Sequence, residues 1–337
     1  MEFGRVNPDD LSGIDFTLPP DHPQTGKVLS GKKAKTKVYE GCVKWGRPEW
    51  VGLIYPKGTK AADFLSHYAK HFNSIELNAT FHQPHTRETI EKWAAMTGEG
   101  FKFCPKVYQG VSHWKRLKEA QAETDKYIES ILGFGDKLGP VLLQVHDNFG
   151  LKSVEVLQNY LRDWPKEIAL QLELRNTNWH TDSIILDETM SLMQELGIGF
   201  VLTDAAGRRD VVHMRLTNQT AFIRWVGNSL HPTDYIRIDE WALRIKEWIG
   251  KGIKEVYFLV HNHDEINTPV ICDYAVKKFN EICGLKLDPP NLLTCYNKKT
   301  AFLMRKRCFL YAVLSFSFYY NTFSSLLPSI SIIYILD

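Results

Sequence analysis

The sequence lacks paired cysteines and glycine-rich phosphate loops. Its six cysteines are scattered over 337 residues with no C-x-x-C spacing, which favours reduced, mostly buried thiols over a disulfide framework or a zinc site. Neither G-x-G-x-x-G nor a Walker sequence occurs, so no dinucleotide or P-loop site is indicated. The first thirty residues contain no apolar run. The sequence therefore predicts no secretory signal and a cytoplasmic location.

A strong excess of one charge is also missing. The formal net charge is +2, from 41 basic and 39 acidic side chains, so a nucleic-acid partner is not favoured. Hydrophobic residues make up 44% and charged residues 24% of the chain, as in ordinary globular proteins with a sizeable core. These values leave the oligomeric state open. The expected partner is a small-molecule substrate, because of the polar side chains at the strand ends described below.

The two ends differ in composition from the middle. Residues 1–36 predict a weakly ordered N-terminal segment that ends in a basic run. Residues 291–337 form an apolar C-terminal tail, with no charged residue from 308 to 336 and three basic residues at 305–307. A membrane-spanning segment and a tail added by altered reading of the gene's end both fit this pattern. A membrane is an expected partner only if the 308–336 tail is genuine and inserts into it. Between the two ends, residues 37–290 are expected to form a single domain.

Within that domain, short apolar runs alternate with amphipathic stretches. The predicted strands are residues 38–43, 74–81, 101–106, 141–145, 169–175, 199–204, 221–226 and 255–262. The predicted helices include residues 61–72, 115–133, 153–163, 184–196, 239–250 and 268–283, with another starting near Thr86. Eight strands with intervening helices predict a TIM-type (β/α)8 barrel, irregular between strands six and seven. An open doubly wound sheet is the alternative.

Polar side chains stand at the ends of these strands, where a parallel barrel gathers them around one rim. The stretch 74–81 brings a carboxylate and an amide to this rim. The predicted catalytic residues are Glu76, Glu173, Lys106 and Asp204. The predicted substrate-binding residues are Asn78, Gln144, Arg175, Trp179, Arg224, His261 and Asn262. Such a charged ring is costly to bury unless its members pair, which marks a candidate active site.

Each charged member has a functional and a structural interpretation. Glu76 and Glu173 suit a general acid and base pair or two ligands of a divalent metal, and equally structural pairing with Lys106 or Arg175. Lys106 suits an anion site or a base of lowered pKa, while the arginines suit carboxylate or phosphate binding. Asp204 is suited to orient a substrate hydroxyl or to bind a metal, and equally to cap a turn or a helix.

Further candidates are an aromatic set and a histidine-rich run. The aromatic set near the rim, which suits stacking on a sugar ring or plain hydrophobic packing, is Trp45, Trp50, Phe81, Trp179 and Trp225. Residues 261–264 read His-Asn-His-Asp, but neighbours on a strand face opposite sides, so a dedicated zinc site is not expected. Whether any cofactor is bound, such as a divalent metal, stays open.

The ordered motifs of the domain resemble those of the YecE-like family of uncharacterised proteins. They include Gly41-Cys42, residues 74–81, 101–106, 138–144, 173–176 and 203–204 with Ile223-Arg224, and the similarity spans roughly residues 38–285. The resemblance implies a TIM-type barrel related to sugar isomerases and to barrels resembling endonuclease IV, without an established reaction. Residues 224–227 read Arg-Trp-Val-Gly, where many members look more like Arg-Leu-His-Gly.

The sequence thus favours an enzyme, an isomerase or hydrolase, that acts on a small polar substrate such as a carbohydrate or sugar phosphate through carboxylate acid/base chemistry. A hydroxyl-rich substrate needs several hydrogen-bonding groups on one rim, and the predicted rim supplies them. Two alternatives stay open. One is a nucleic-acid-processing enzyme of the endonuclease IV type, and the other is a non-catalytic protein that binds a small molecule.

Overall fold

The computed structural model describes residues 3–29, 31, 35–181 and 183–293, which belong to one compact unit, Met1–Leu293. The predicted apolar tail lies outside the described residues from residue 294 onward, so both interpretations of it stay open. In the described part, every helix is too short or too polar to cross a membrane. Its cysteines, Cys42, Cys104, Cys272 and Cys283, are free thiols, and the first three are buried, as the sequence predicts.

The strands form two sheets in which every pairing is parallel. The six-stranded sheet has the order β3 (Lys102–Pro105), β2 (Ser74–Leu77), β1 (Lys37–Cys42), β9 (Glu255–Asn262), β8 (Thr220–Gly227) and β7 (Leu202–Asp204). The three-stranded sheet has the order β4 (Val141–Gln144), β5 (Leu170–Glu173) and β6 (Gly199–Phe200). The predicted α/β class is therefore confirmed.

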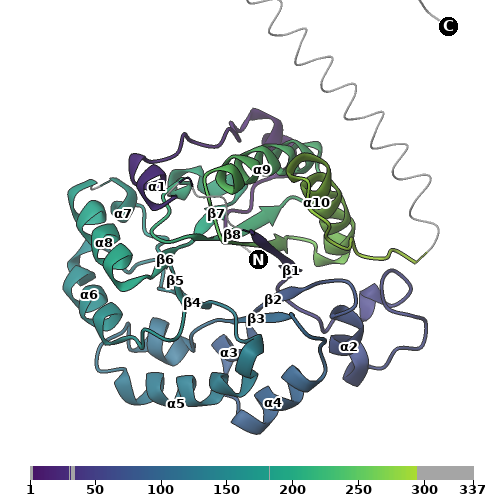
Figure 1. Cartoon of the computed structure of the whole chain (residues 1–337), viewed down its shortest axis with the longest axis horizontal. Coiled ribbons are helices and arrows are strands. Elements are labelled where there is room, and N and C mark those ends of the chain that lie inside the picture. The colour runs from purple at the N-terminus through teal and green to yellow at the C-terminus, as the bar shows by residue number, and fades with distance from the viewer. Residues whose placement is uncertain (1–2, 30, 32–34, 182, 294–337) are drawn as a thin grey trace, which may run out of the picture. The chain divides into compact units, whose positions relative to one another are not determined.

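The two sheets meet at both ends. Isolated parallel bridges Phe103↔Leu138 and Lys106↔Leu142 link the β3 side to the β4 side, and a single residue, Val201, separates β6 from β7. Strands of both sheets face a shared interior in Figure 1. Buried side chains fill that interior, namely Tyr39, Cys104, Leu142, Val201, Phe222, Tyr257 and Leu259. Both sheets therefore share one core.

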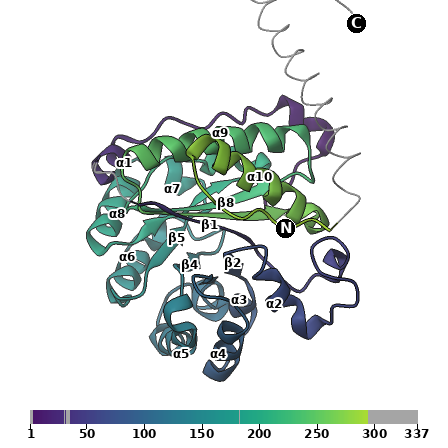
Figure 2. The same cartoon turned by 45° about the vertical axis from the view of Figure 1, so that its right-hand side comes forward.

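Helices lie outside the strands (Figures 1 and 2). The α-helices are α1 (Pro23–Val28), α2 (Phe64–Tyr68), α3 (Ala79–His82), α4 (Arg87–Ala95), α5 (Gln121–Ile131), α6 (Val154–Asp163), α7 (Asn178–Thr181), α8 (Ser183–Leu196), α9 (Pro232–Gly250) and α10 (Thr268–Cys283). Shorter helical turns are Pro8–Gly13, Pro48–Trp50, Ala61–Asp63, Gly110–Trp114, Leu132–Lys137, Leu151–Ser153, Ala206–Val211 and Glu265–Asn267.

Several predicted elements are shorter in the structure. Strand β2 ends at Leu77, and the rest of the stretch 74–81 turns into α3. The turn is held by the Thr80 hydroxyl, which bonds the carbonyls of Leu77 (2.9 Å) and Lys106 (2.8 Å). Residues 61–72 form only a 3-10 turn and α2, and α5 begins at Gln121 instead of residue 115. Residues 205–219, between β7 and β8, contain only a 3-10 turn, which matches the predicted irregularity.

Residues 3–29, which the sequence predicts to be weakly ordered, carry two short helices and buried side chains. Leu11 packs in one cluster with Phe16 and Ala206. The Asp21 carboxylate accepts hydrogen bonds from Arg244 at 2.9 Å and from the Trp248 indole at 3.1 Å, both on α9. Apolar burial and these hydrogen bonds offset the conformational entropy that is lost when the segment becomes ordered. The partners, Ala206 and helix α9, are far from the segment in sequence, so no local pattern indicates these contacts.

Candidate active site

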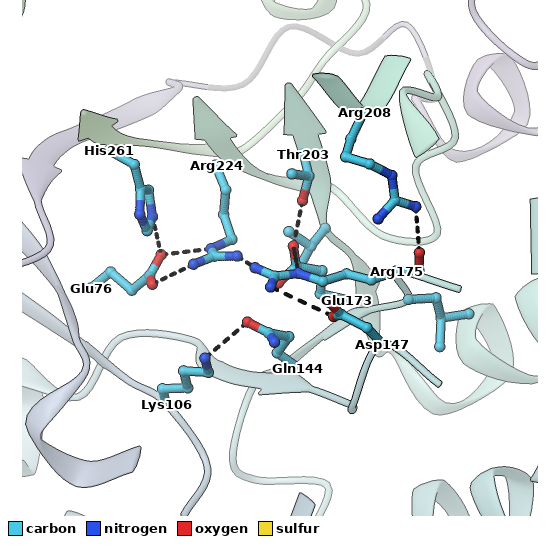
Figure 3. Close-up of polar contacts among 12 residues, drawn as sticks. Glu76, Lys106, Gln144, Asp147, Glu173, Arg175, Thr203, Arg208, Arg224 and His261 are labelled. Carbon is cyan, nitrogen blue, oxygen red and sulfur yellow. Dashed lines mark hydrogen bonds and ion pairs between the residues drawn. The ribbon is translucent and has the colours of Figure 1, made fainter. Parts of the chain in front are cut away.

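Charged and polar side chains from seven strands or their ends converge at the carboxyl-terminal side of the sheets (Figure 3). The set, called here the strand-end cluster, is Glu76, Lys106, Gln144, Glu173, Arg175, Thr203, Arg224 and His261. All eight are buried, and the most exposed, Arg175, is 7% exposed. The structure thus brings together seven predicted site residues, because the strands run parallel and present their carboxyl ends on one side.

Arg224 on β8 is the centre of the cluster. Its guanidinium binds Glu76 through two parallel bonds, Nε to Oε2 and Nη2 to Oε1, both 2.8 Å. Its third nitrogen, Nη1, donates to Oε2 of Glu173 at 2.6 Å. This planar fork holds two carboxylates in fixed positions. The predicted structural interpretation pairs the glutamates with Lys106 or Arg175. In the structure Glu173 does pair with Arg175, but both glutamates pair with Arg224 and neither pairs with Lys106.

Both glutamates are held as carboxylates. Burial alone would raise the pKa of Glu173, but Arg175, Arg224 and the Thr203 hydroxyl lower it to about 2. The Thr203 hydroxyl donates to Oε1 of Glu173 at 2.7 Å, and Nε of Arg175 donates to the same oxygen at 3.0 Å. The pKa of Glu76 likewise lies well below its usual value, since Arg224 and His261 outweigh burial. Carboxylates with such low pKa values exchange protons poorly near neutral pH.

His261 completes the environment of Glu76. Its Nε2 lies 2.9 Å from Oε2 of Glu76, so the bond requires the proton on Nε2. Burial lowers the pKa of His261 although Glu76 opposes the shift, which keeps the ring neutral at pH 7. Asn78 also donates to Glu76, from Nδ2 to Oε1 at 3.3 Å.

Lys106 differs from the other charged members because its partner is neutral. Its Nζ donates to Oε1 of Gln144 at 2.8 Å and lies 3.9 Å from the centre of the Phe81 ring. In the described part of the chain no carboxylate lies within ion-pair distance of this amine. Burial, together with the charges of Arg224 and Arg175, lowers the pKa of Lys106 to about 7. Its amine can therefore gain or lose a proton near neutral pH.

The glutamates do not fit the predicted role of metal ligands. Arg224 bonds both carboxylates and occupies the position between them, which a divalent cation would need. Across the described ranges, no three side chains of His, Cys, Asp or Glu are grouped to hold a metal ion. The residues of the cluster suit an anionic or polar ligand better than a cation.

Asp204 lies outside the strand-end cluster. On β7 the preceding Thr203 faces Glu173, so the next side chain faces the opposite side. The Asp204 carboxylate instead accepts a bond from the Trp241 indole at 2.8 Å and pairs with Arg237 at 2.9 Å, both on α9, and with Arg209. These contacts give it a structural role between strand and helix, and the predicted catalytic role has no support from its position.

Trp179 and Asn262 are also separate from the cluster. The Trp179 indole is fully buried and donates to the carbonyl of Phe149 at 2.6 Å. Asn262 accepts a bond from the backbone N–H of Ser229 at 2.9 Å. Both side chains support loops next to the site, so substrate binding by them stays a prediction.

Among the aromatic candidates, Phe81 contacts the cluster through Lys106. The Trp50 indole is buried and donates to the carbonyl of Glu265. Trp225 follows Arg224 on β8, and its ring packs against the Arg237 guanidinium. Because Arg224 faces the cluster, Trp225 faces the helix side. Trp45 stacks edge-on with Trp93.

Sequence reasoning assigned no site role to Thr203, which belongs to the cluster, or to Phe3 and His113, which lie beside it. Thr203 is identifiable only once the facing of β7 is known. Phe3 lies with its ring 3.9 Å from the guanidinium carbon of Arg175, which no local pattern indicates. His113 packs against Phe81, and burial, with the nearby Lys106 charge, lowers its pKa to about 4. Phe81, His113 and Phe3 thus line the cluster near Lys106 and Arg175.

Comparisons with known proteins agree with the resemblance seen in the sequence. The model of a family described as "Protein of unknown function DUF72" matches residues 39–291. The UPF0759 protein YecE of Escherichia coli K12 is 23% identical over 253 residues, which cover 69% of this chain and 89% of YecE. The UPF0759 protein YunF of Bacillus subtilis is 32% identical over 170 residues, 48% of this chain and 58% of YunF.

The solved structures give the same result for the fold. A DUF72 family protein of Enterococcus faecalis V583 superposes with a TM-score of 0.58 at 18% identity, covering 76% of this chain and 98% of that protein. At this identity the likeness concerns the fold alone. The described N-terminal residues 3–29 lie outside the matched family region, although Phe3 contacts the site.

Proposed function

The chain belongs to the DUF72 family, which carries no assigned reaction, and from its site we propose an enzyme that acts on a small polar substrate bearing negative charge, such as a sugar phosphate. The proposed chemistry is acid/base catalysis of an isomerisation or a hydrolysis. The observation that carries this proposal is the buried Lys106 amine, whose close partners among the described residues are only the Gln144 amide and an aromatic ring.

Charge balance supports an anionic substrate. Within the cluster, the two carboxylates of Glu76 and Glu173 compensate the two guanidiniums of Arg175 and Arg224. The protonated Lys106 then adds an uncompensated positive charge, and burying it is unfavourable. In addition, Nη2 of Arg175 is buried without a hydrogen-bond partner in the described structure. An anionic group of the substrate would satisfy both.

The roles within the site follow from these pKa directions. Lys106, with a pKa of about 7, is the proposed proton-transfer group, since a catalytic pKa near the working pH is most effective. Glu76 and Glu173 fix Arg224, instead of exchanging protons as the sequence alone predicts. Arg175, Arg224, Gln144 and the neutral His261 orient the substrate.

We further infer that the two sheets close into the TIM-type (β/α)8 barrel predicted from the sequence. The bridges between the β3 and β4 sides and the direct succession of β6 and β7 support closure. In such barrels, reactions take place at the carboxyl ends of the strands, where the strand-end cluster lies. The barrel alone names no substrate, since many unrelated reactions share it.

A two-stage experiment tests the proposed function. First, a thermal-shift screen compares sugars, sugar phosphates and short oligonucleotides, and we expect stabilisation by phosphorylated sugars. Second, conversion of each stabilising compound is followed by NMR for the wild type, Lys106→Met and a control, Lys118→Met, whose side chain is exposed. We expect turnover to disappear only in Lys106→Met.

Three outcomes contradict the proposal. Stabilisation by oligonucleotides alone favours the nucleic-acid-processing alternative. Stabilisation by a sugar phosphate that is never converted favours a non-catalytic binding protein. Full turnover by Lys106→Met removes the proposed role of the amine.

A further inference from the structure

A pocket of about 230 Å³ lies on the outer side of β1. Tyr39 points into the shared core, so the next residue, Glu40, faces the opposite side. The pocket is lined by Glu40, by residues 69–73 after α2, by Val276 on α10 and by residues 286–288. No residue of the strand-end cluster lines it.

Glu40 is an unusual group to find in such a pocket. Its side chain is 3% exposed, and its Oε1 has no hydrogen-bond partner in the described part of the chain. Its backbone N–H donates to Oδ1 of Asn73 at 2.7 Å, and Asn73 in turn donates to the carbonyl of Val38 at 3.0 Å. The backbone around Glu40 is thereby fixed, while one carboxyl oxygen stays unsatisfied. A buried polar atom of this kind is costly unless a partner is supplied.

The walls of the pocket are also fixed. Asn280 on α10 holds Leu287 from both sides, donating from Nδ2 to its carbonyl and accepting its N–H at Oδ1, each at 2.8 Å. The N–H of Asn291 donates to Nδ1 of His71 at 3.2 Å. Hydrogen bonds therefore hold the segment that follows α10 in place as one wall of the pocket.

The charged lining residues have opposite signs. Glu40 is the buried acid, while Lys70 and Lys286 are the basic residues of the lining. A ligand complementary to this arrangement carries a positive group toward Glu40 and a negative group toward the lysines. Asp288 and His71 also line the pocket, and they add hydrogen-bonding capacity.

We propose that this pocket binds a small molecule with a primary ammonium group, which pairs with Glu40, and an anionic group, which pairs with Lys70 and Lys286. An ammonium group supplies the donor that Oε1 lacks. The proposal does not depend on the reaction at the strand-end cluster, because no residue is shared between the two sites.

Binding is linked to proton release. Burial raises the pKa of Glu40 to about 8, while the Cys272 thiol lowers it and Asp273 raises it. The other titratable groups that face Glu40 or line the pocket are Cys42, Tyr68, Lys70, His71, Lys286 and Asp288. At pH 7 the free carboxyl is therefore mostly protonated. An arriving ammonium group favours the carboxylate, so binding releases up to about one proton.

Titration calorimetry with O-phosphoethanolamine tests the proposal on the full chain at pH 7. Two buffers with different ionisation enthalpies, neither a primary amine nor a phosphate, report the protons released. We expect wild-type binding with proton release, and at least about tenfold weaker binding for Glu40→Gln. Lys286→Ala is expected to weaken binding as well. Lys118→Ala, at an exposed position, is the matched control and should bind like the wild type.

Ethyl phosphate, which lacks the ammonium group, should not compete. The proposal is overturned if the wild type gives no saturable binding, if Glu40→Gln binds as tightly as the wild type, or if ethyl phosphate competes equally. Urea unfolding of Glu40→Gln checks its fold. Should that variant fail to fold, unchanged binding by Lys286→Ala overturns the proposal by itself.

Discussion

Replacing Lys106 by methionine tests the central claim about the strand-end cluster without a known substrate. The pKa of this amine falls from 10.5 to about 7 in the folded protein, first because of burial and then because of Arg224 and Arg175. Between these pH values the unfolded chain holds a proton that the folded protein has released. Stability therefore rises with pH in this window, by at most about 1.36 kcal/mol per unit. Below pH 7 both states are protonated and the penalty is constant.

The magnitude follows from the size of the window. From pH 7.5 to 9.0, the wild type should gain about 2 kcal/mol in unfolding free energy relative to Lys106→Met. At pH 6, where the charged amine is buried without a carboxylate partner, we expect the variant to be more stable than the wild type by roughly 3 kcal/mol or more. Methionine has a similar length and fills the same space next to Phe81.

Urea unfolding at several pH values measures this difference, and subtraction of the two curves removes the titrations common to both proteins. The exposed Lys118→Met provides the control, for which the difference should stay flat. A flat difference for Lys106→Met as well would refute the reasoning, because it would mean that Lys106 keeps its ordinary pKa and is not a proton-transfer group at neutral pH.

Three further substitutions probe other parts of the structure. Glu173→Gln should lower the unfolding free energy by about 3 to 5 kcal/mol at pH 7, since two buried guanidiniums lose a carboxylate partner. In the wild type this stabilisation should be lost as the pH falls from 4.5 toward 2. Equal stabilities of variant and wild type at pH 7 in urea unfolding would contradict the prediction. Asp204→Asn should also destabilise the folded protein, because Arg237 is buried against this carboxylate. The thermal shift caused by a ligand of the strand-end cluster should stay unchanged, and its loss would show that Asp204 takes part in ligand binding. Gly4→Ala should detach the N-terminal segment, since Gly4 has φ +71° and an added Cβ would lie 2.5 Å from the Ala205 side chain. In the control Gly13→Ala, the added Cβ meets open space. Limited proteolysis should cut Gly4→Ala faster than the control, and equal rates would show that the segment tolerates the change.

The protonation states at the site were beyond reach of the sequence. The sequence placed two glutamates at strand ends and allowed them to be an acid and base pair, metal ligands or structural charges. Only the folded structure shows that Arg224 bonds both at once. The residues involved are separated by 148 and 51 positions along the chain, so no local pattern specifies the contact. The same fold gives Lys106 an amide partner, and the proposed role of this amine in proton transfer rests on that contact.

The sequence by itself determined the α/β class, the order of the elements and seven residues of the strand-end cluster. It could do so because strand and helix periods are local, and because parallel strands gather their carboxyl ends on one side. Tertiary structure decided the facing of Asp204 toward α9, the placement of Phe3 against Arg175 and the unsatisfied carboxyl of Glu40 in its pocket. These depend on side-chain facing and on packing between distant segments, where burial and charge pairing act across space and leave no local signature.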